Sequence, residues 1–429
     1  MGKPRGEGKL YAPILVLIIL VAVLSLAVAY SNRGITASDL KNDAACYHEL
    51  AISMLERGQY SGNFTALSER FQYDATYRPP GYPAFLALIY LLAGKGNIAA
   101  VFYVQAILFA FTIYIVYLIM LEITQKRRHA MVAALVCSLY PMSYQSIPMA
   151  LSEIVSGAVL AVTILLLLKA RAKGSPTYAL WAGVFISLSA FFKPIMLPFG
   201  LIAAVMMFFP KGAVKKSAAC AALLICGCAV TILPWTVRNY VRTGEIIPVA
   251  TGFGYNFWLG NWPELYQPNS KILLMPDDLY AKTRNISMVE KDRIFLREGL
   301  SYITENPLRA GVNFGRKFGC LWLGHLGISP KESPVWIAVG DFGIFKGTLI
   351  YVLLFAVAIG GWVGSSAEVK RRSLPVAAVL LLWTFSYVLV TAQERYALPV
   401  SFYECAFAAL WVARKWDAIS SRHASGNLN

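Results

Sequence analysis

The feature that most constrains this chain is a series of long apolar stretches, each about 18 residues or more, that recurs along its length. An α-helix needs roughly 20 predominantly apolar residues to cross about 30 Å of hydrocarbon. Only 14% of the 429 residues are charged and 57% are hydrophobic, which lies outside the range of ordinary soluble domains. The sequence therefore predicts an all-α polytopic membrane protein.

We predict ten membrane spans from these stretches. A further apolar stretch, 82–94, is too short to cross comfortably, and we expect it along the outer interface. The first stretch ends in AVA, which is typical of a signal-peptide cleavage site. Its apolar core is longer than the usual length of about 7–15 residues, so a retained helix is favoured. The spans are 11–30, 97–121, 130–145, 150–168, 177–192, 194–209, 217–235, 344–363, 374–391 and 398–413.

Basic residues follow the membrane topology that these spans imply. With the N-terminus in the cytoplasm, each of the six cytoplasmic segments carries three Lys or Arg residues, as the positive-inside rule requires. The formal net charge of +16 is therefore explained by topology, and it requires no nucleic-acid partner. We expect a multi-pass protein of the cytoplasmic (inner) membrane with both termini in the cytoplasm.

The spans divide the chain into six parts, two of which are sizeable segments on the outer side. The second outer segment has nearly balanced charge, which favours a small folded cap over a domain that binds polyanions. The predicted parts are the tail and first span (1–30), the first outer loop (31–96), a transmembrane bundle (97–235), an extracytoplasmic segment (236–343), the C-terminal spans (344–413) and a cytoplasmic tail (414–429).

An amphipathic helix is expected in the first outer loop. Asp39, Asp43 and Tyr47 are spaced four residues apart and would share one helical face. Gly58 and Gly62 bracket the expected end of this helix. Such a helix would lie in the outer interface, with its carboxylates near the membrane surface.

Cysteine and histidine spacing predicts no metal site. The seven cysteines show no paired spacing typical of metal ligands, and the four histidines are scattered. We predict no cofactor, although dependence on a divalent metal stays open. Cys46 and Cys320 are the two cysteines expected on the outer side, and the sequence does not decide whether they pair.

Isolated charges beside Pro, Trp or Tyr gather where the predicted spans meet the outer face. They are Glu153, Lys193, Arg238, Glu394 and Arg395. Any one of them would be explained as a helix cap or as a side chain that reaches into the headgroups. The cytoplasmic edges lack a comparable set, so a functional site at the outer face is the better hypothesis.

Arg78 is a further charged residue next to a predicted membrane segment. It stands with two prolines directly ahead of an apolar run, in YRPPGYPAFLALIYLLAG. An arginine beside a bilayer needs water or an anionic partner. The prolines prevent a regular helix from starting before Gly81 or Tyr82. We therefore expect a charged, kinked segment that leads into a helix close to the membrane.

Five motifs occur in order along nearly the whole chain: NDAACYHELA, YRPPGYPAFLALIYLLAG, LSE at the start of a span, LPWTVRN followed by VATGFGYNFWLGN, and ERYALPV. Together they resemble the membrane glycosyltransferases of the GT-C superfamily. The resemblance is to the group related to dolichyl-phosphate-mannose–protein mannosyltransferases and to the lipid A aminoarabinose transferase. It implies a GT-C-like fold with interfacial helices in the first outer loop.

The resemblance also implies roles for particular residues. The family has a catalytic aspartate in the first outer loop, and Asp43 is the best match, with Asp39 in reserve. A basic residue before the Pro-Pro pair helps to bind the donor's phosphate in the family, and Arg78 occupies that position. Arg238 and Arg395 would be further contacts to the phosphate or headgroup.

The remaining residues assigned to the site flank these. Tyr47 and Tyr82 are expected to help bind the donor. The other outer-face candidates are Glu153, Lys193, Asn239 and Tyr396. One departure weakens assignment to the aminoarabinose transferase subfamily, which has an acidic residue and an arginine between its aspartate and tyrosine. Here that interval holds Ala44, Ala45 and Cys46.

The function implied is transfer of a sugar from a polyprenyl-phosphate donor to a lipid, glycan or protein acceptor at the outer face of the bilayer. Asp43 would be the general base of an inverting single displacement. A polysaccharide polymerase or ligase is the nearest alternative. A transporter would place its charges near the bilayer midplane, often in repeated halves. A non-catalytic scaffold would tolerate loss of the Asp43 carboxylate.

Overall fold

A computed structural model describes residues 7–65, 71–208, 214–262, 275–323 and 344–426 of the chain. Within these ranges helices dominate, and the only strands form one short antiparallel hairpin in which Phe64 pairs with Tyr73. The predicted class, an all-α polytopic membrane protein, is confirmed.

The described elements are helices, apart from two short strands. In chain order they are α1 (Glu7–Ser31), η1 (Ala37–Asp39), α2 (Asn42–Arg57), β1 (Asn63–Thr65), β2 (Gln72–Asp74), η2 (Ala75–Tyr77), α3 (Gly81–Ala93), α4 (Ile98–Thr124), α5 (Arg127–Ser138), α6 (Pro141–Ser146), α7 (Glu153–Lys173), α8 (Pro176–Phe192), η3 (Pro194–Met196), α9 (Phe199–Met206), α10 (Val214–Thr243), α11 (Phe253–Asn261), α12 (Asp277–Thr283), α13 (Met288–Glu305), α14 (Pro307–Trp322), α15 (Ile344–Val363), α16 (Ala367–Arg372), α17 (Leu374–Leu389), η5 (Glu394–Ala397) and α18 (Leu398–Gly426).

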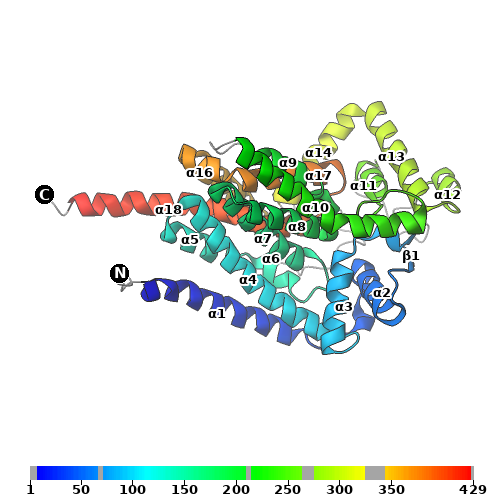
Figure 1. Ribbon diagram of the computed structural model, residues 1–429, viewed down its shortest axis with the longest axis horizontal. Helices are drawn as coiled ribbons and strands as arrows, with labels where there is room; N and C mark the ends of the chain where they lie inside the picture. Colours follow the sequence, from blue (N-terminus) through cyan, green and yellow to red (C-terminus); the bar gives the residue numbers. More distant parts are fainter. Residues whose placement is uncertain (1–6, 66–70, 209–213, 263–274, 324–343, 427–429) are drawn as a thin grey trace.

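The long helices lie side by side, and both chain ends are at the same end of the molecule (Figure 1). The opposite end carries α2, α3, the hairpin and α12 (Figure 1). There α3 runs across the end of α4 instead of extending the bundle (Figure 1). We call this end, opposite the termini, the distal end.

Five helices in the described ranges are long and apolar enough to cross a membrane, so the predicted count of ten spans is not confirmed. Several shorter apolar helices accompany them, among them α8 and α17. The five are Ala12–Ser31, Ile98–Thr124, Glu153–Lys173, Val214–Thr243 and Glu394–Ser420.

Two predicted spans are wrong as continuous helices, and proline accounts for both. The span 130–145 is broken between α5 and α6, because Pro141 cannot donate a backbone hydrogen bond and instead starts a new helix. In the span 194–209, the α-helical part α9 follows Pro198 and has eight residues, which extend only about 12 Å.

Two other predicted spans are longer in the structure than expected. The span predicted to end at 235 continues through Pro234 as far as Thr243 in α10. The helix predicted over 398–413 also continues, as α18, beyond its expected end.

The first outer loop contains the predicted amphipathic helix, although it begins later than the spacing suggested. α2 starts at Asn42 and ends at Arg57, and it is capped by Gly58, whose left-handed backbone (φ 61°) favours glycine. Asp39 belongs to the separate turn η1, where its carboxylate accepts hydrogen bonds from the Thr36 backbone N–H and hydroxyl. The expectation that Asp39 shares a helical face with Asp43 is therefore wrong.

A second hydrophobic core joins the hairpin to α11, α12 and α13 at the distal end. The rings of Phe71 and Tyr255 stack with centroids 3.7 Å apart, and Phe295 meets both of them edge-on. Gly254 allows α11 to lie directly against the Asp292 carbonyl of α13, where a side chain would clash. This aromatic core ties residues from both polar segments of the chain into one cap.

We predict that the distal end faces away from the cytoplasm. In a chain whose seven native cysteines are replaced, Gln59→Cys at the distal end should react with a membrane-impermeant maleimide in intact cells. Ala172→Cys, an exposed position in the basic last turn of α7, should react only after the cells are permeabilised. The reverse pattern would contradict the proposed orientation.

Candidate active site

The YRPP segment forms a fixed turn between the hairpin and α3. The Asp74 carboxylate accepts hydrogen bonds from the backbone N–H and hydroxyl of Thr76, which caps η2. Arg78 then has an extended backbone, as the residue before a proline prefers. The prolines delay the helix until Gly81, so the side chain of Arg78 is held by irregular backbone at the distal end.

Gly81 is required because α3 begins against the end of α8. A Cβ atom at Gly81 would lie 2.7 Å from the carbonyl oxygen of Phe191. Lys193 follows Phe191 by two residues and lies between α8 and η3. The PPGYP motif thus brings the Arg78 turn close to the segment that carries Lys193.

The Asp43 carboxylate lies between two arginines from distant parts of the chain. Its Oδ1 accepts a hydrogen bond from Arg78 Nη2 at 2.7 Å, and its Oδ2 accepts one from Arg395 Nη2 at 2.8 Å. Asp43 comes from the first turn of α2, and Arg395 comes from η5, more than 300 residues later. Each oxygen therefore has its own guanidinium donor, the strong charge-assisted form of hydrogen bond.

A second carboxylate extends this pair into a continuous cluster. Glu153, at the start of α7, is 4% exposed and lies 3.2 Å from Lys193 Nζ and 3.7 Å from Arg395 Nη1. We call Asp43, Arg78, Glu153, Lys193 and Arg395 the charged cluster. It holds three cations and two anions, so it has a formal excess of one positive charge.

Two polar atoms within the charged cluster are buried and have no hydrogen-bond partner in the described part of the chain. They are Arg78 Nε, a donor, and Glu153 Oε2, an acceptor. Buried polar atoms are nearly always paired in proteins, so each such exception calls for an explanation. The free donor on Arg78 and the excess positive charge both suit an additional anionic ligand.

Opposing effects set the pKa of Asp43. Burial by itself would raise the pKa, but the guanidiniums of Arg78 and Arg395 outweigh it and hold the pKa well below its usual range. The carboxylate is therefore ionised at neutral pH. Its ion pairs stabilise the fold above the unfolded pKa of aspartate, and this contribution is lost as the pH falls through the depressed folded value.

Aromatic rings surround the guanidinium of Arg78. Its central carbon lies 5.0, 5.3 and 5.6 Å from the ring centroids of Tyr77, Tyr73 and Tyr47 respectively. Arg78 also donates a hydrogen bond of 3.0 Å to the Tyr73 hydroxyl. These contacts fix the guanidinium in one orientation and add cation–π attraction.

Tyr82 packs beside Tyr47 and does not reach the charged cluster. Its ring meets that of Tyr47 edge-on at 5.2 Å, and its hydroxyl donates to Gln105 Oε1 at 2.9 Å. Gln105 Nε2 in turn donates to the carbonyls of Ile147 and Met149, at 2.8 Å each. Tyr82 therefore connects α3 and α4 to the loop that precedes α7.

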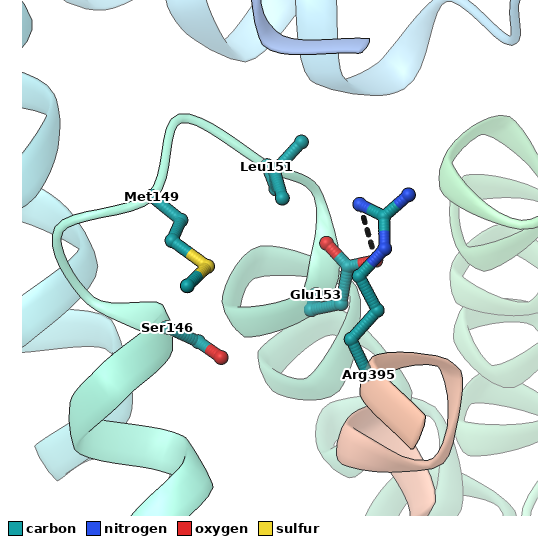
Figure 2. Close-up of a pocket in the computed structure, with 5 residues that line it drawn as sticks. All are labelled: Ser146, Met149, Leu151, Glu153 and Arg395. Carbon is teal, nitrogen blue, oxygen red and sulfur yellow. Dashed lines mark ion pairs between the residues drawn. The ribbon is translucent and has the colours of Figure 1, made fainter. Parts of the chain in front are cut away.

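That loop forms one wall of a small pocket beside the charged cluster. Figure 2 shows Ser146, Met149 and Leu151 on one side of the pocket and Glu153 with Arg395 on the other. Most of the wall is apolar, and the polar groups converge from α7 and η5. An apolar pocket with a few convergent charges is the usual form of a ligand site.

The structure brings most of the residues predicted from the sequence together, but three others besides Tyr82 lie apart from the charged cluster. Tyr396 belongs to the assembled group, because Lys193 Nζ lies 5.4 Å from its ring centroid. Arg238 instead donates to the backbone carbonyl of Tyr60, at 2.6 Å, and stacks near Trp235. Asn239 is buried and donates to the Ile247 carbonyl, so it has a structural role. Asp39, the third, forms the η1 cap.

Metal ligands and disulfides do not contribute to the site in the part of the chain that is described. Among those residues, no three His, Cys, Asp or Glu side chains gather in a group that could hold a metal ion. Cys46 and Cys320 are both free cysteines.

Sequence reasoning missed several polar residues that support the site. Gln393 accepts a hydrogen bond of 2.8 Å from Arg395 Nε, and Lys317 donates to the carbonyls of Leu389 and Val390 just ahead of η5. Gln105 and Glu404 each stand inside a predicted span. A polar residue within a span is itself a signal of function, and it was available in the sequence.

One known protein family matches part of the chain. Residues 77–237 match the family described as dolichyl-phosphate-mannose-protein mannosyltransferase. The matched range includes Arg78, Glu153 and Lys193. No curated protein sequence matches the chain.

Solved structures of an archaeal oligosaccharyltransferase show the same fold. The Archaeoglobus fulgidus oligosaccharyltransferase tethered to an acceptor peptide matches with a TM-score of 0.59 and 18% identity, over 96% of this chain and 51% of that one. The same protein, AglB, in complex with an inhibitory peptide and a dolichol-phosphate, matches with a TM-score of 0.58 and 18% identity, over 97% and 52%. The chain has the GT-C fold.

The fold implied by the motifs is therefore confirmed, and the family match covers residues 77–237. The chain spans about half the length of the archaeal oligosaccharyltransferase. ArnT from Cupriavidus metallidurans bound to undecaprenyl phosphate also matches, with 16% identity over 93% of this chain and 78% of that one, but its TM-score of 0.42 is too low to establish a shared fold.

We predict that Glu153 is essential to the stability of the charged cluster. Glu153→Gln should lower the free energy of unfolding by about 3–5 kcal/mol, because it leaves the buried Lys193 ammonium without its carboxylate. Equilibrium unfolding in detergent micelles would measure this loss. In the matched control, Glu298→Gln breaks an exposed pair with Lys282 and should cost no more than about 1 kcal/mol. Equal losses would contradict the buried role of Glu153.

Proposed function

We propose that this GT-C chain is a glycosyltransferase that takes its sugar from a polyprenyl-phosphate donor. The carrying observation is the placement of the Asp43 carboxylate between the guanidiniums of Arg78 and Arg395, at 2.7 and 2.8 Å. Guanidinium groups that hold a carboxylate in this way also match the oxygens of a phosphate. The excess positive charge of the charged cluster supports an anionic ligand at the same place.

The donor's phosphate would compete with Asp43 for the two arginines. Arg78 retains a buried Nε–H without a described partner, so it has a donor ready for a phosphate oxygen. As the phosphate draws the guanidiniums toward itself, Asp43 loses the charges that depress its pKa. Donor binding would thereby convert Asp43 from a weak base into a stronger one.

The transfer step is a single displacement. The acceptor hydroxyl gives its proton to Asp43 while its oxygen forms a bond to the anomeric carbon. The bond between the anomeric carbon and the phosphate oxygen breaks, and the electron pair leaves with the polyprenyl phosphate. Arg78 and Arg395 stabilise the charge that develops on this leaving group. The products are the glycosylated acceptor, with inverted configuration, and polyprenyl phosphate.

The relatives support the class of donor and acceptor in this proposal. The matched family is described by a dolichyl-phosphate-linked mannose donor and a protein acceptor, and the archaeal oligosaccharyltransferase was solved with a dolichol-phosphate and a peptide. For this chain we propose a lipid-linked donor and a hydroxyl acceptor on lipid, glycan or protein. The active site would lie on the extracytoplasmic side of the inner membrane.

We predict that Arg78 binds the donor phosphate. Arg78→Ala should weaken donor binding at least about 10-fold, since a charge-assisted hydrogen bond contributes roughly 1.5–3 kcal/mol. Arg78→Lys should recover only part of the affinity, because lysine lacks the planar fork. The measurement is binding of a purified polyprenyl-phosphate sugar to protein in nanodiscs. Arg57→Ala, an exposed arginine of α2, is the matched control. Wild-type affinity in Arg78→Ala would exclude this role.

We predict that Asp43 is the base. Asp43→Asn should reduce turnover by roughly 10²–10⁴-fold, because the amide cannot accept the proton. Donor affinity should be retained or should rise, since both arginines remain and the phosphate no longer competes with a carboxylate, and this separates the catalytic role from a role in binding. The measurement is a transfer assay with a polyprenyl-phosphate sugar, together with the donor binding constant.

The matched control for that experiment is Asp39→Asn. Asp39 is an exposed carboxylate whose hydrogen bonds cap η1, so its loss should leave turnover near that of the wild type. Full activity in Asp43→Asn would remove Asp43 from the mechanism. A large loss confined to Asp39→Asn would assign the reaction to the other carboxylate.

A further inference from the structure

A second pocket lies beside the charged cluster, on the other side of η5. It is lined by Tyr140 ahead of α6, Trp322 of α14, Tyr351 of α15, Glu394 of η5 and Glu404 of α18, together with apolar side chains. Arg395 faces the first pocket, whereas its neighbour Glu394 lines the second. Two adjacent residues of opposite charge therefore serve two different pockets.

Glu404 is the residue that the proposed transfer leaves unexplained. It lies within the α18 span, is 6% exposed, and its Oε1 has no hydrogen-bond partner in the described part of the chain. An isolated buried carboxylate is expensive unless it is neutralised or paired. Because this side chain lines the pocket, a ligand in the pocket can supply the missing partner.

The other lining residues indicate the sign of that partner's charge. Among the described residues that line the pocket, two are acidic and none is basic. The rings of Tyr140 and Tyr351 meet edge-on with centroids 6.2 Å apart, and Trp322 adds a third aromatic wall. Carboxylates and aromatic faces together favour an organic cation, through ion pairing and cation–π attraction.

The composition of the pocket also separates an organic cation from a metal ion. Divalent metals such as Ca²⁺ and Mg²⁺ prefer six or more oxygen ligands, whereas this pocket supplies two carboxylates among mostly apolar and aromatic walls. The cavity volume of about 10 Å³ has room for one group of the size of a water molecule, so it suits the ammonium group itself, with the rest of the ligand outside the pocket.

We propose that the pocket around Glu404 binds a primary ammonium group carried by a substrate of the transfer reaction. The inference rests on the proposed function, because η5 places this pocket next to the arginine that would hold the donor phosphate. The ammonium belongs either to an amino sugar or to the headgroup of an aminated lipid. It pairs with Glu404 and lies against the rings of Tyr140 and Tyr351, and Glu394 adds negative charge to the same pocket.

The test measures ligand-dependent thermal stability of the full chain in phosphatidylcholine nanodiscs. One arm compares glucosamine with N-acetylglucosamine, and the other compares glycerophosphoethanolamine with glycerophosphoglycerol. We expect at least one amine to raise the unfolding midpoint by about 2 °C or more at saturation, while its partner without the amine does not. The arm that responds identifies the source of the ammonium group.

Variants assign that response to the pocket. Glu404→Gln should abolish the shift, and Glu394→Gln should reduce it and serves as the readout if Glu404→Gln does not fold. Glu49→Gln, an exposed carboxylate of α2, should keep the full shift. No shift with either amine, equal shifts with the analogues that lack the amine, or a full shift in both pocket variants would overturn the proposal.

A further variant separates this inference from the proposed function. Arg78→Ala removes the predicted phosphate contact but leaves the pocket around Glu404 unchanged, so it should keep the amine-dependent shift. If wild-type protein shows the amine-dependent shift but no binding of a polyprenyl-phosphate sugar, the proposed function fails and the ammonium site stands. If wild-type protein binds the donor but shows no amine-dependent shift, the ammonium site fails and the proposed function stands.

Discussion

Asp43 is hydrogen-bonded by two guanidinium groups that come from opposite ends of the chain, and the distal end is organised around this contact. Arg78 reaches it from the turn ahead of α3, and Arg395 reaches it from η5. Removing one member of such a group leaves an uncompensated charge, which is far more costly than the pair itself is favourable. The position of the turn ahead of α3 and the position of η5 therefore both depend on the Asp43 carboxylate.

Several neighbouring features serve to hold these charges in place. Tyr82 and Gln105 fix the loop ahead of Glu153, so the second carboxylate stays against Lys193 and Arg395. Lys317 caps the carbonyls at the end of α17, which fixes the chain just before η5. The site is thus assembled from irregular segments whose backbone polar groups are satisfied by side chains, as a membrane environment demands.

The two pockets differ in the charge of the residues around them. The pocket beside Arg395 has excess positive charge nearby, and the pocket beside Glu394 is acidic and aromatic. Because these two residues are adjacent in η5, a small shift of this segment would change both environments together. In the proposed reaction, such an arrangement would present an anionic leaving group and a cationic substrate group on either side of one short turn.

By itself the sequence determined the membrane class and the main long helices, and it pointed to all five members of the charged cluster. It could do so because apolar length and basic loops follow from the cost of placing polar groups in hydrocarbon. Helix breaks at Pro141 and Pro198 were also readable, since proline interrupts helices locally. Glu404 could likewise be recognised in the sequence as an acidic residue within a predicted span.

What only the tertiary structure decided is which charges meet. Asp43 and Arg395 are separated by most of the chain, and nothing local links them. Asp39 and Asp43 had the spacing of one helical face, but the cap that Asp39 forms with Thr36 moved the helix start to Asn42. Arg238 resembled the other outer-face cations, yet it donates to the Tyr60 carbonyl. Ion pairing depends on distances of a few ångströms between distant segments, and local sequence does not encode those distances.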